Sequence, residues 1–225
     1  MKNSILSWSS GKDSALAMYY AQKDPNINLV SLMTTLSEKY QRISMHGVQK
    51  EFLEKQAGRM DLSLELIYLP ADCSNEVYNS IMEQKMKKLK EGNINTVIFG
   101  DIFLEDIRTY REENLSKVNM NAHFPLWGIS TEKLAHKFID LGFKAVITCV
   151  DSEYLDKRFI GREYNTEFLS DLPKNVDPCG ENGEFHSFVY DGPLFNKAIS
   201  YKLGKVVFQD NQFYFIDLLE KKEQS

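Results

Sequence analysis

Short apolar runs alternate with amphipathic segments over the first 151 residues, and this alternation limits the possible folds more than any other feature. Most runs are nearly continuous, which is typical of parallel strands that are covered on both faces. Between them, apolar residues recur at helical spacing over residues 48–60, 77–89 and 134–141, which predicts three helices. We therefore predict an α/β fold with a doubly wound, mostly parallel, Rossmann-like sheet and right-handed crossovers. The predicted strands cover residues 5–8, 29–33, 64–69, 96–99 and 145–150.

The organisation of the chain changes after Asp151. Pro173 and Pro178 interrupt this part, and two apolar runs at 205–208 and 213–219 predict a closing β-hairpin. We expect a large domain over residues 1–151 and a small C-terminal α+β subdomain over residues 152–225 that completes the active site.

Composition excludes several classes of protein. The net charge of −5 argues against a general nucleic-acid binder, and no apolar run approaches the length of a membrane span. The three cysteines lack metal-ligand spacing, which favours reduced thiols. We expect a cytoplasmic protein with no secretory leader and no membrane contact.

The stretch from Ser7 to Ser14 joins the first predicted strand to a helix. A strand that turns into a helix at small residues directs free N–H groups and the positive helix end toward one point, which favours an anion. Gly11 permits close approach of a phosphate, Lys12 adds a positive charge, and Asp13 fits a helix cap or a metal ligand. Because Asp13 follows Lys12, the stretch is not a Walker A loop. The alternative is a surface turn that only caps a helix.

Ligands of such sheets bind beyond the carboxyl ends of the strands. Thr34 and Thr35 follow the second predicted strand, although β propensity alone also explains two threonines there. Gly100 and Asp101 follow the fourth, and Asp101 begins a charged helical segment. Either this segment is a solvated helix face, or Asp101 holds Mg²⁺ or substrate while Arg108 or Arg111 faces a carboxylate or a polyphosphate.

A second informative stretch runs from Asp177 to Phe195. Its glycines and proline predict a rigid loop, and the strand that follows places Glu184 and His186 on one face. Together with Glu181, these ionisable groups can bind Mg²⁺, hold an amine or move a proton. The alternative for His186 is a hydrogen-bonded structural histidine.

Residues 9–14, Ser-Ser-Gly-Lys-Asp-Ser, resemble the PP-loop of the N-type ATP pyrophosphatases, with Ser10 where that family usually has Gly. Combined with residues 180–195, the chain resembles the diphthine–ammonia ligase family. The stretch Pro125-Leu126-Trp127-Gly128 and the pair Gly161-Arg162 also look like elements of that family, so the likeness covers residues 4–195.

This resemblance implies an ATP-dependent amide ligase that releases AMP and pyrophosphate. A carboxylate on diphthine, a modified histidine of the translocation elongation factor, is adenylated, and ammonia then displaces AMP; Mg²⁺ assists. The residues expected to bind ATP are Ser9, Ser10, Gly11, Lys12, Asp13, Ser14, Thr34, Thr35, His46 and Gly100. The expected catalytic residues are Lys12, Asp13, Glu184 and His186; the substrate residues are Asp101, Arg108, Arg162, Glu181, Gly183 and Glu184; and the Mg²⁺ ligands are Asp13 and Asp101.

The segment 101–108 departs from the family pattern, which has Ser-x-Tyr-Gln-Arg after the glycine. The acceptor can therefore be diphthine on a protein or a different, small-molecule carboxylate. The sequence leaves two other functions open, adenylation of an RNA base and nucleotide sensing without chemistry, and it also leaves open whether the protein forms a homodimer.

Overall fold

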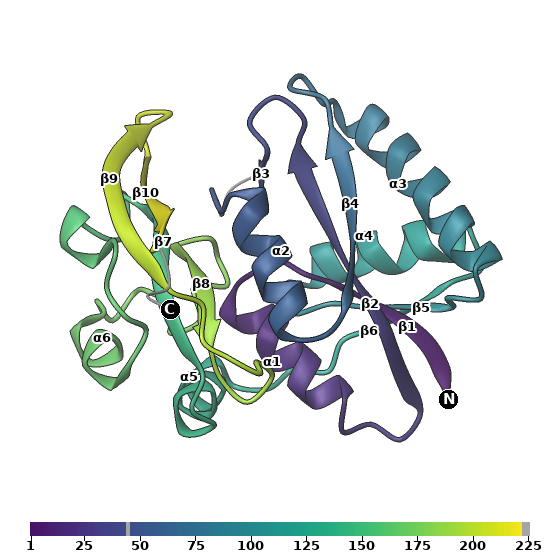
Figure 1. The fold of residues 1–225 in the computed structure, drawn as a ribbon, viewed down its shortest axis with the longest axis horizontal. Helices are drawn as coiled ribbons and strands as arrows, with labels where there is room; N and C mark the ends of the chain where they lie inside the picture. The colour runs from purple at the N-terminus through teal and green to yellow at the C-terminus, as the bar shows by residue number, and fades with distance from the viewer. Residues whose placement is uncertain (44–45, 222–225) are drawn as a thin grey trace.

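The computed structural model describes residues 1–43 and 46–221 and contains two sheets (Figure 1). The elements built around the first sheet are β1 (Lys2–Ser7), α1 (Lys12–Ala21), β2 (Ile27–Ser37), β3 (Arg42–Ile43), α2 (Lys50–Arg59), β4 (Ser63–Leu69), α3 (Asn75–Glu91), β5 (Thr96–Ile98), α4 (Glu105–Ser116) and β6 (Asn121–His123). The elements that follow are α5 (Thr131–Asp140), β7 (Lys144–Asp151), the 3₁₀ helix η1 (Lys157–Phe159), α6 (Thr166–Asp171), β8 (Phe185–Asp191), β9 (Tyr201–Gln209) and β10 (Phe213–Glu220).

The first sheet has its parallel strands in the order β4-β2-β1-β5-β6, with the short β3 antiparallel to the end of β2. This confirms the predicted α/β fold with a mostly parallel sheet. The strand order reverses beside β1, which pairs with β2 on one side and β5 on the other. Chain segments that leave β1 and β5 therefore diverge and open a crevice at the carboxyl edge, where such folds bind ligands.

Helices cover both faces of the first sheet. Neighbouring residues of one strand point to opposite faces, so Leu6 of β1 joins the apolar core that contains α1 and α2. Ile5 instead joins a second cluster, with Met86 of α3 and Leu115 of α4. Figure 1 shows the two helix pairs on either side of the strands. Burial of both faces explains why these strands read as continuous apolar runs.

The second sheet is antiparallel, in the order β8-β7-β10-β9. The expectation that residues 145–150 form another parallel strand is wrong, because β7 pairs antiparallel with β8 and β10. Ala145 to Asp151 are all buried, so β7 has the continuous apolar pattern of a parallel strand without being one. The hairpin predicted at the end of the chain is confirmed as β9 and β10. Where the chain divides into domains stays a prediction.

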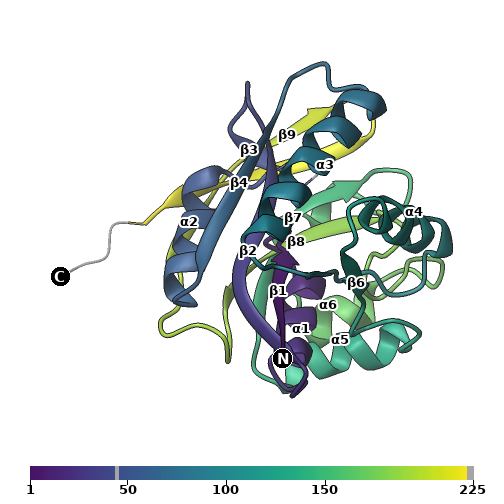
Figure 2. The same cartoon turned by 90° about the vertical axis from the view of Figure 1, so that its right-hand side faces the viewer.

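The second sheet lies against α1, through contacts between that helix and β8 (Figures 1 and 2). This contact brings the segment that precedes β8 to the carboxyl edge of the first sheet. None of the helices in the described part of the chain is long and apolar enough to cross a membrane.

Candidate active site

The loop between β1 and α1 is held by its own hydroxyls. Ser9 Oγ donates to Ser14 Oγ at 3.1 Å, and Ser14 Oγ donates to the carbonyl of Gly11 at 2.9 Å. Gly11 precedes the helix in an extended conformation, whereas Ser10 has a φ of 70° in the left-handed region. The helix therefore starts at Lys12 and directs its first N–H groups toward the crevice.

Lys12 is a buried cation at the start of α1, with 3% of its surface exposed. Its Nζ lies 2.7 Å from Asp13 Oδ2 and also donates to the carbonyl of Cys179. Burial lowers the pKa of Lys12, but the charge of Asp13 offsets that effect, and the pKa is raised overall. Lys12 therefore stays charged and is available to an anion in the crevice.

Side chains of β8 and α2 hold the loop between β1 and α1 in place through hydrogen bonds. Ser187 Oγ of β8 accepts a hydrogen bond from the N–H of Lys12 at 3.2 Å. The fully buried Gln56 of α2 accepts from Trp8 Nε1 at 2.8 Å and donates to the carbonyl of Ser10 at 3.1 Å. Gln56 and Ser187 are absent from the residues expected at the site, because their partners lie 46 to 175 residues away.

The loop before β8 is held together by Glu184. Glu184 is 1% exposed and accepts hydrogen bonds from the N–H groups of Asp177 at 2.9 Å and Asn182 at 3.0 Å, and from Asn182 Nδ2 at 2.9 Å. Its carboxylate faces the loop rather than the crevice, a different position from the one expected for a catalytic group. Glu181 instead lines the crevice and accepts from the N–H of Ile102 at 2.7 Å. Burial raises the pKa of Glu181 to about 7.

His46 and His186 stack in the crevice, with ring centroids 4.2 Å apart and planes inclined by 30°. Burial lowers the pKa of both imidazoles, that of His186 to about 4, so both are neutral at pH 7. His46 Nδ1 and His186 Nε2 are buried without a hydrogen-bond partner in the described part of the chain. Two buried polar atoms are therefore left for a ligand to satisfy.

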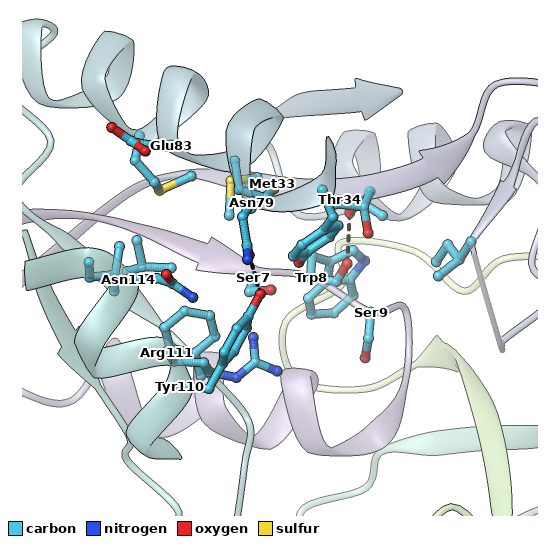
Figure 3. Close-up of a pocket in the computed structure, with 18 of the residues that line it drawn as sticks. Ser7, Trp8, Ser9, Met33, Thr34, Asn79, Glu83, Tyr110, Arg111 and Asn114 are labelled. Carbon is cyan, nitrogen blue, oxygen red and sulfur yellow. Dashed lines mark hydrogen bonds between the residues drawn. The ribbon is translucent and has the colours of Figure 1, made fainter. Parts of the chain in front are cut away.

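Two cavities meet at this edge of the sheet. The first, here called the loop cavity, has a volume of about 250 Å³. The second, the strand-end cavity, has a volume of about 280 Å³ and lies between the strand ends, α3 and α4, where Figure 3 shows Trp8, Thr34, Tyr110 and Arg111. The residues that line both cavities are Ser7, Ser9, His46, Phe99 and Arg111.

Most of the expected site residues gather at these cavities. Those that line the loop cavity are Ser9, Gly11, Lys12, Asp13, Ser14, His46, Gly100, Asp101, Glu181, Gly183 and His186, and those that line the strand-end cavity include Thr34 and Thr35. Ser10 belongs to the same loop but is fully buried and lines neither cavity. Thr34 Oγ1 donates to the carbonyl of Trp8 at 2.7 Å, so this side chain is part of the cavity wall.

Two expected arginines lie outside both cavities. Arg108 donates to Glu112 at 2.9 Å, and its guanidinium lies 4.7 Å from the centroid of Trp127. Arg162 pairs with Asp171 at 2.8 Å beside α6. Arg111, one turn after Arg108, is the α4 arginine that lines both cavities.

The carboxylates of Asp13 and Asp101 are the candidate ligands for Mg²⁺ in the loop cavity. Both line the loop cavity, and Asp13 Oδ1 and Asp101 Oδ2 are buried atoms that accept no hydrogen bond from any described residue. No group of three or more His, Cys, Asp or Glu side chains in residues 1–43 and 46–221 is placed to hold a metal ion. Two carboxylates together with substrate phosphates are a donor set that Mg²⁺ commonly takes.

Comparison with known proteins identifies the family. The model of the diphthamide synthase N-terminal domain matches residues 1–121, and that of the diphthamide synthase C-terminal domain matches residues 130–221.

The relatives that match the chain are named diphthine–ammonia ligases. The diphthine–ammonia ligase of Mus musculus is 30% identical over 220 residues, which cover 85% of this chain and 79% of the mouse protein. That of Rattus norvegicus is 30% identical over 217 residues, with the same coverage of 85% and 79%. That of Schizosaccharomyces pombe is 26% identical over 153 residues, which cover 66% of this chain and 25% of the yeast protein. The chain therefore belongs to the diphthamide synthase, or diphthine–ammonia ligase, family of ATP-dependent ligases.

Proposed function

We propose that this protein adenylates an acceptor carboxylate with ATP and then converts it to an amide with ammonia, releasing AMP and pyrophosphate. The acceptor that the name of its relatives indicates is diphthine. One observation carries the proposal: the loop cavity combines an anion-binding helix start at Lys12 with the ionisable groups Glu181 and His186. Nucleotide sensing alone does not call for these ionisable groups beside a phosphate.

In the first step, a carboxylate oxygen of the acceptor attacks the α-phosphorus of ATP. The bond from that phosphorus to the oxygen bridging the β-phosphorus breaks, and pyrophosphate leaves with the bonding electrons. Lys12 and the N–H groups at the start of α1 stabilise the charge that develops on pyrophosphate. Asp13 and Asp101 would hold Mg²⁺, which when bound neutralises phosphate charge.

In the second step, the nitrogen of ammonia attacks the acyl carbon and the bond from that carbon to AMP breaks. The nitrogen loses one proton as the amide forms. Glu181 has a pKa of about 7, a good match for a base at neutral pH, and lines the cavity. Glu184 positions this loop through its hydrogen bonds. Neutral His186 has a low pKa of about 4 and is a weak base, so its buried Nε2 serves as a contact for ammonia or the acceptor.

The proposal extends to the surroundings of the reaction. The strand-end cavity receives adenine and ribose, beside Thr34 and Thr35. The three cysteines are free, consistent with a location in the cytoplasm.

The test supplies ATP, Mg²⁺, ammonium and a translation elongation factor that carries diphthine. We expect AMP, pyrophosphate and the amide in equal amounts, and Lys12→Ala to reduce all three by at least about a hundredfold. Release of ADP, or of AMP without amide, would contradict the proposal. Replacing the elongation factor with small carboxylates or with RNA tests the other acceptors. Glu184→Gln and His186→Ala test the roles of the acidic loop, and unchanged product formation in both would contradict those roles.

A further inference from the structure

Arg111 of α4 lies where the loop cavity and the strand-end cavity meet, and its side chain lines both. Its guanidinium carbon lies 4.3 Å from the centroid of Phe99. Its Nη2 donates to Asp101 Oδ1 at 3.1 Å, and its Nε lies 3.0 Å from Asp101 Oδ2. Figure 3 shows the guanidinium in the cavity beside Tyr110. The ring and the carboxylate together fix the position and plane of this cation.

The pairing of Arg111 with Asp101 is incomplete. Nε of Arg111 and Oδ2 of Asp101 are buried, and despite their separation of 3.0 Å neither makes a hydrogen bond with acceptable geometry to a described residue. The planar guanidinium presents its donors in a fork that matches a carboxylate. Its five N–H donors are more than Asp101 alone accepts, so Arg111 can bind an anionic ligand at this junction while it stays paired with Asp101.

Arg111 and Lys12 approach the loop cavity from opposite faces of the first sheet. Lys12 begins α1, which packs with Leu6, whereas α4 packs through Leu115 with Ile5. In the described part of the chain, these two are the lysine and arginine side chains that line the loop cavity. An attacking oxygen and a leaving oxygen lie roughly in line across the phosphorus. If Lys12 holds the leaving pyrophosphate, the attacking group comes from the side of Arg111.

We infer that Arg111 binds the carboxylate of the acceptor and presents one of its oxygens to the α-phosphate. This assignment rests on the proposed function. It makes Arg111, rather than Arg108, the residue of α4 that recognises the acceptor.

Two binding measurements test the assignment. Calorimetry gives the affinity for α,β-methylene-ATP, and a second titration of the nucleotide-loaded protein gives the affinity for an elongation factor that carries diphthine. We expect Arg111→Gln to weaken acceptor binding about tenfold to a hundredfold, the size expected for a lost charge-assisted hydrogen bond. Because Arg111 also lines the strand-end cavity, nucleotide affinity should fall as well, but by a clearly smaller factor. Arg111→Lys keeps the positive charge but loses the forked donors of the guanidinium. Its acceptor affinity should lie between those of wild type and Arg111→Gln. Arg158→Gln removes an exposed arginine paired with Asp156 and serves as the matched control.

Arg108→Gln decides between the two arginines of α4. The assignment is overturned if Arg108→Gln weakens acceptor binding and Arg111→Gln does not, if Arg111→Gln weakens nucleotide binding as much as acceptor binding, or if wild type and Arg111→Gln bind the acceptor equally. Comparable melting temperatures of the variants show that each is folded. The nature of the products is a separate readout: release of ADP refutes the proposed reaction, while loss of acceptor binding in Arg111→Gln still supports the site.

Discussion

The hydroxyl oxygen of Ser187 accepts a hydrogen bond from the backbone N–H of Lys12 at 3.2 Å, between residues 175 positions apart in the chain. A strand of the second sheet thus caps the helix that begins the anion-binding loop of the first. Because both groups are buried, the start of α1 depends on the position of β8.

Ser187→Ala should destabilise the protein, because it leaves the buried N–H of Lys12 without an acceptor. We expect a loss of about 1 kcal/mol in the free energy of unfolding and a melting temperature lower by about 2–4 °C. Scanning calorimetry measures both. Ser116→Ala, at an exposed helix end, is the control and should change neither. An equal melting temperature in Ser187→Ala and wild type would contradict this role.

Ser10→Gly should stabilise the protein by about 0.5–1 kcal/mol. Ser10 has a φ of 70°, which glycine adopts without steric cost, and its buried Oγ has no hydrogen-bond partner among the described residues. Denaturant midpoints measure the change. Ser10→Ala separates the causes, since it removes the hydroxyl and retains the Cβ. If Ser10→Ala gains as much as Ser10→Gly, the backbone conformation is not the reason.

Gly100→Ala should displace the start of α1. A Cβ at this position would lie 3.0 Å from Asp13 C and Ser14 N, which are backbone atoms and cannot move independently of the loop. We expect a loss of about 1–3 kcal/mol in the free energy of unfolding and a weaker affinity for α,β-methylene-ATP.

Gly58→Ala is the matched control for Gly100→Ala. A Cβ at Gly58 has no neighbour within 4 Å, and alanine favours the interior of α2. This variant should gain up to about 1 kcal/mol and bind the nucleotide normally. Unchanged nucleotide affinity in Gly100→Ala would show that the loop tolerates the added carbon.

Glu184→Gln should loosen the loop before β8. The amide keeps the shape of the side chain, but it weakens charge-assisted hydrogen bonds and directs a donor toward the N–H groups of Asp177 or Asn182. We expect a loss of about 2 kcal/mol in the free energy of unfolding, measured by chemical denaturation. The exposed Glu167→Gln is the control. A loss that is no larger in Glu184→Gln than in Glu167→Gln would count against the structural role.

Glu181 should make stability depend on pH. Its pKa of about 7 in the folded protein lies above the ordinary value of 4.5, so between these values the folded state binds more protons than the unfolded state. The free energy of unfolding contributed by this group therefore falls as pH rises from about 4.5 to 7. The difference in free energy of unfolding between Glu181→Gln and wild type should shift in favour of the variant by about 1–2 kcal/mol as pH rises from 5 to 7.5. Denaturation curves at several pH values measure this change, and a constant difference between the two proteins would contradict it.

Local periodicity identified the long elements of the fold. It did not identify the short strands, and it did not give the direction of a strand that is buried on both faces. The helices near residues 48–60, 77–89 and 134–141 were found as α2, α3 and α5. The strands β3 and β6 have two and three residues, too few for a periodic signal. The direction of β7 depends on its partners β8 and β10, and the pattern of one strand carries no information about its partner.

The candidate site shows the same limit at the level of side chains. Arg108 and Arg111 lie three positions apart on one helix, and only the positions of Phe99, Asp101 and Trp127 distinguish the arginine at the cavities from the one outside them. Glu181 and Glu184 lie on one short loop. Glu184 accepts hydrogen bonds from Asp177 and Asn182 within that loop, whereas Glu181 lines the loop cavity.

The sequence by itself determined the strand–loop–helix unit at residues 9–14, the parallel sheet that carries it, and the acidic loop near Glu184. These features depend on the spacing of residues that are close together in the chain, and that spacing is visible in the amino-acid sequence. Only the tertiary structure decided which ionisable groups face the cavities, how Ser187 and Gln56 support the loop, and which sheet contains β7. These outcomes depend on burial and on hydrogen bonds between residues far apart in the chain, so the physical interaction exists only after the two sheets have packed together.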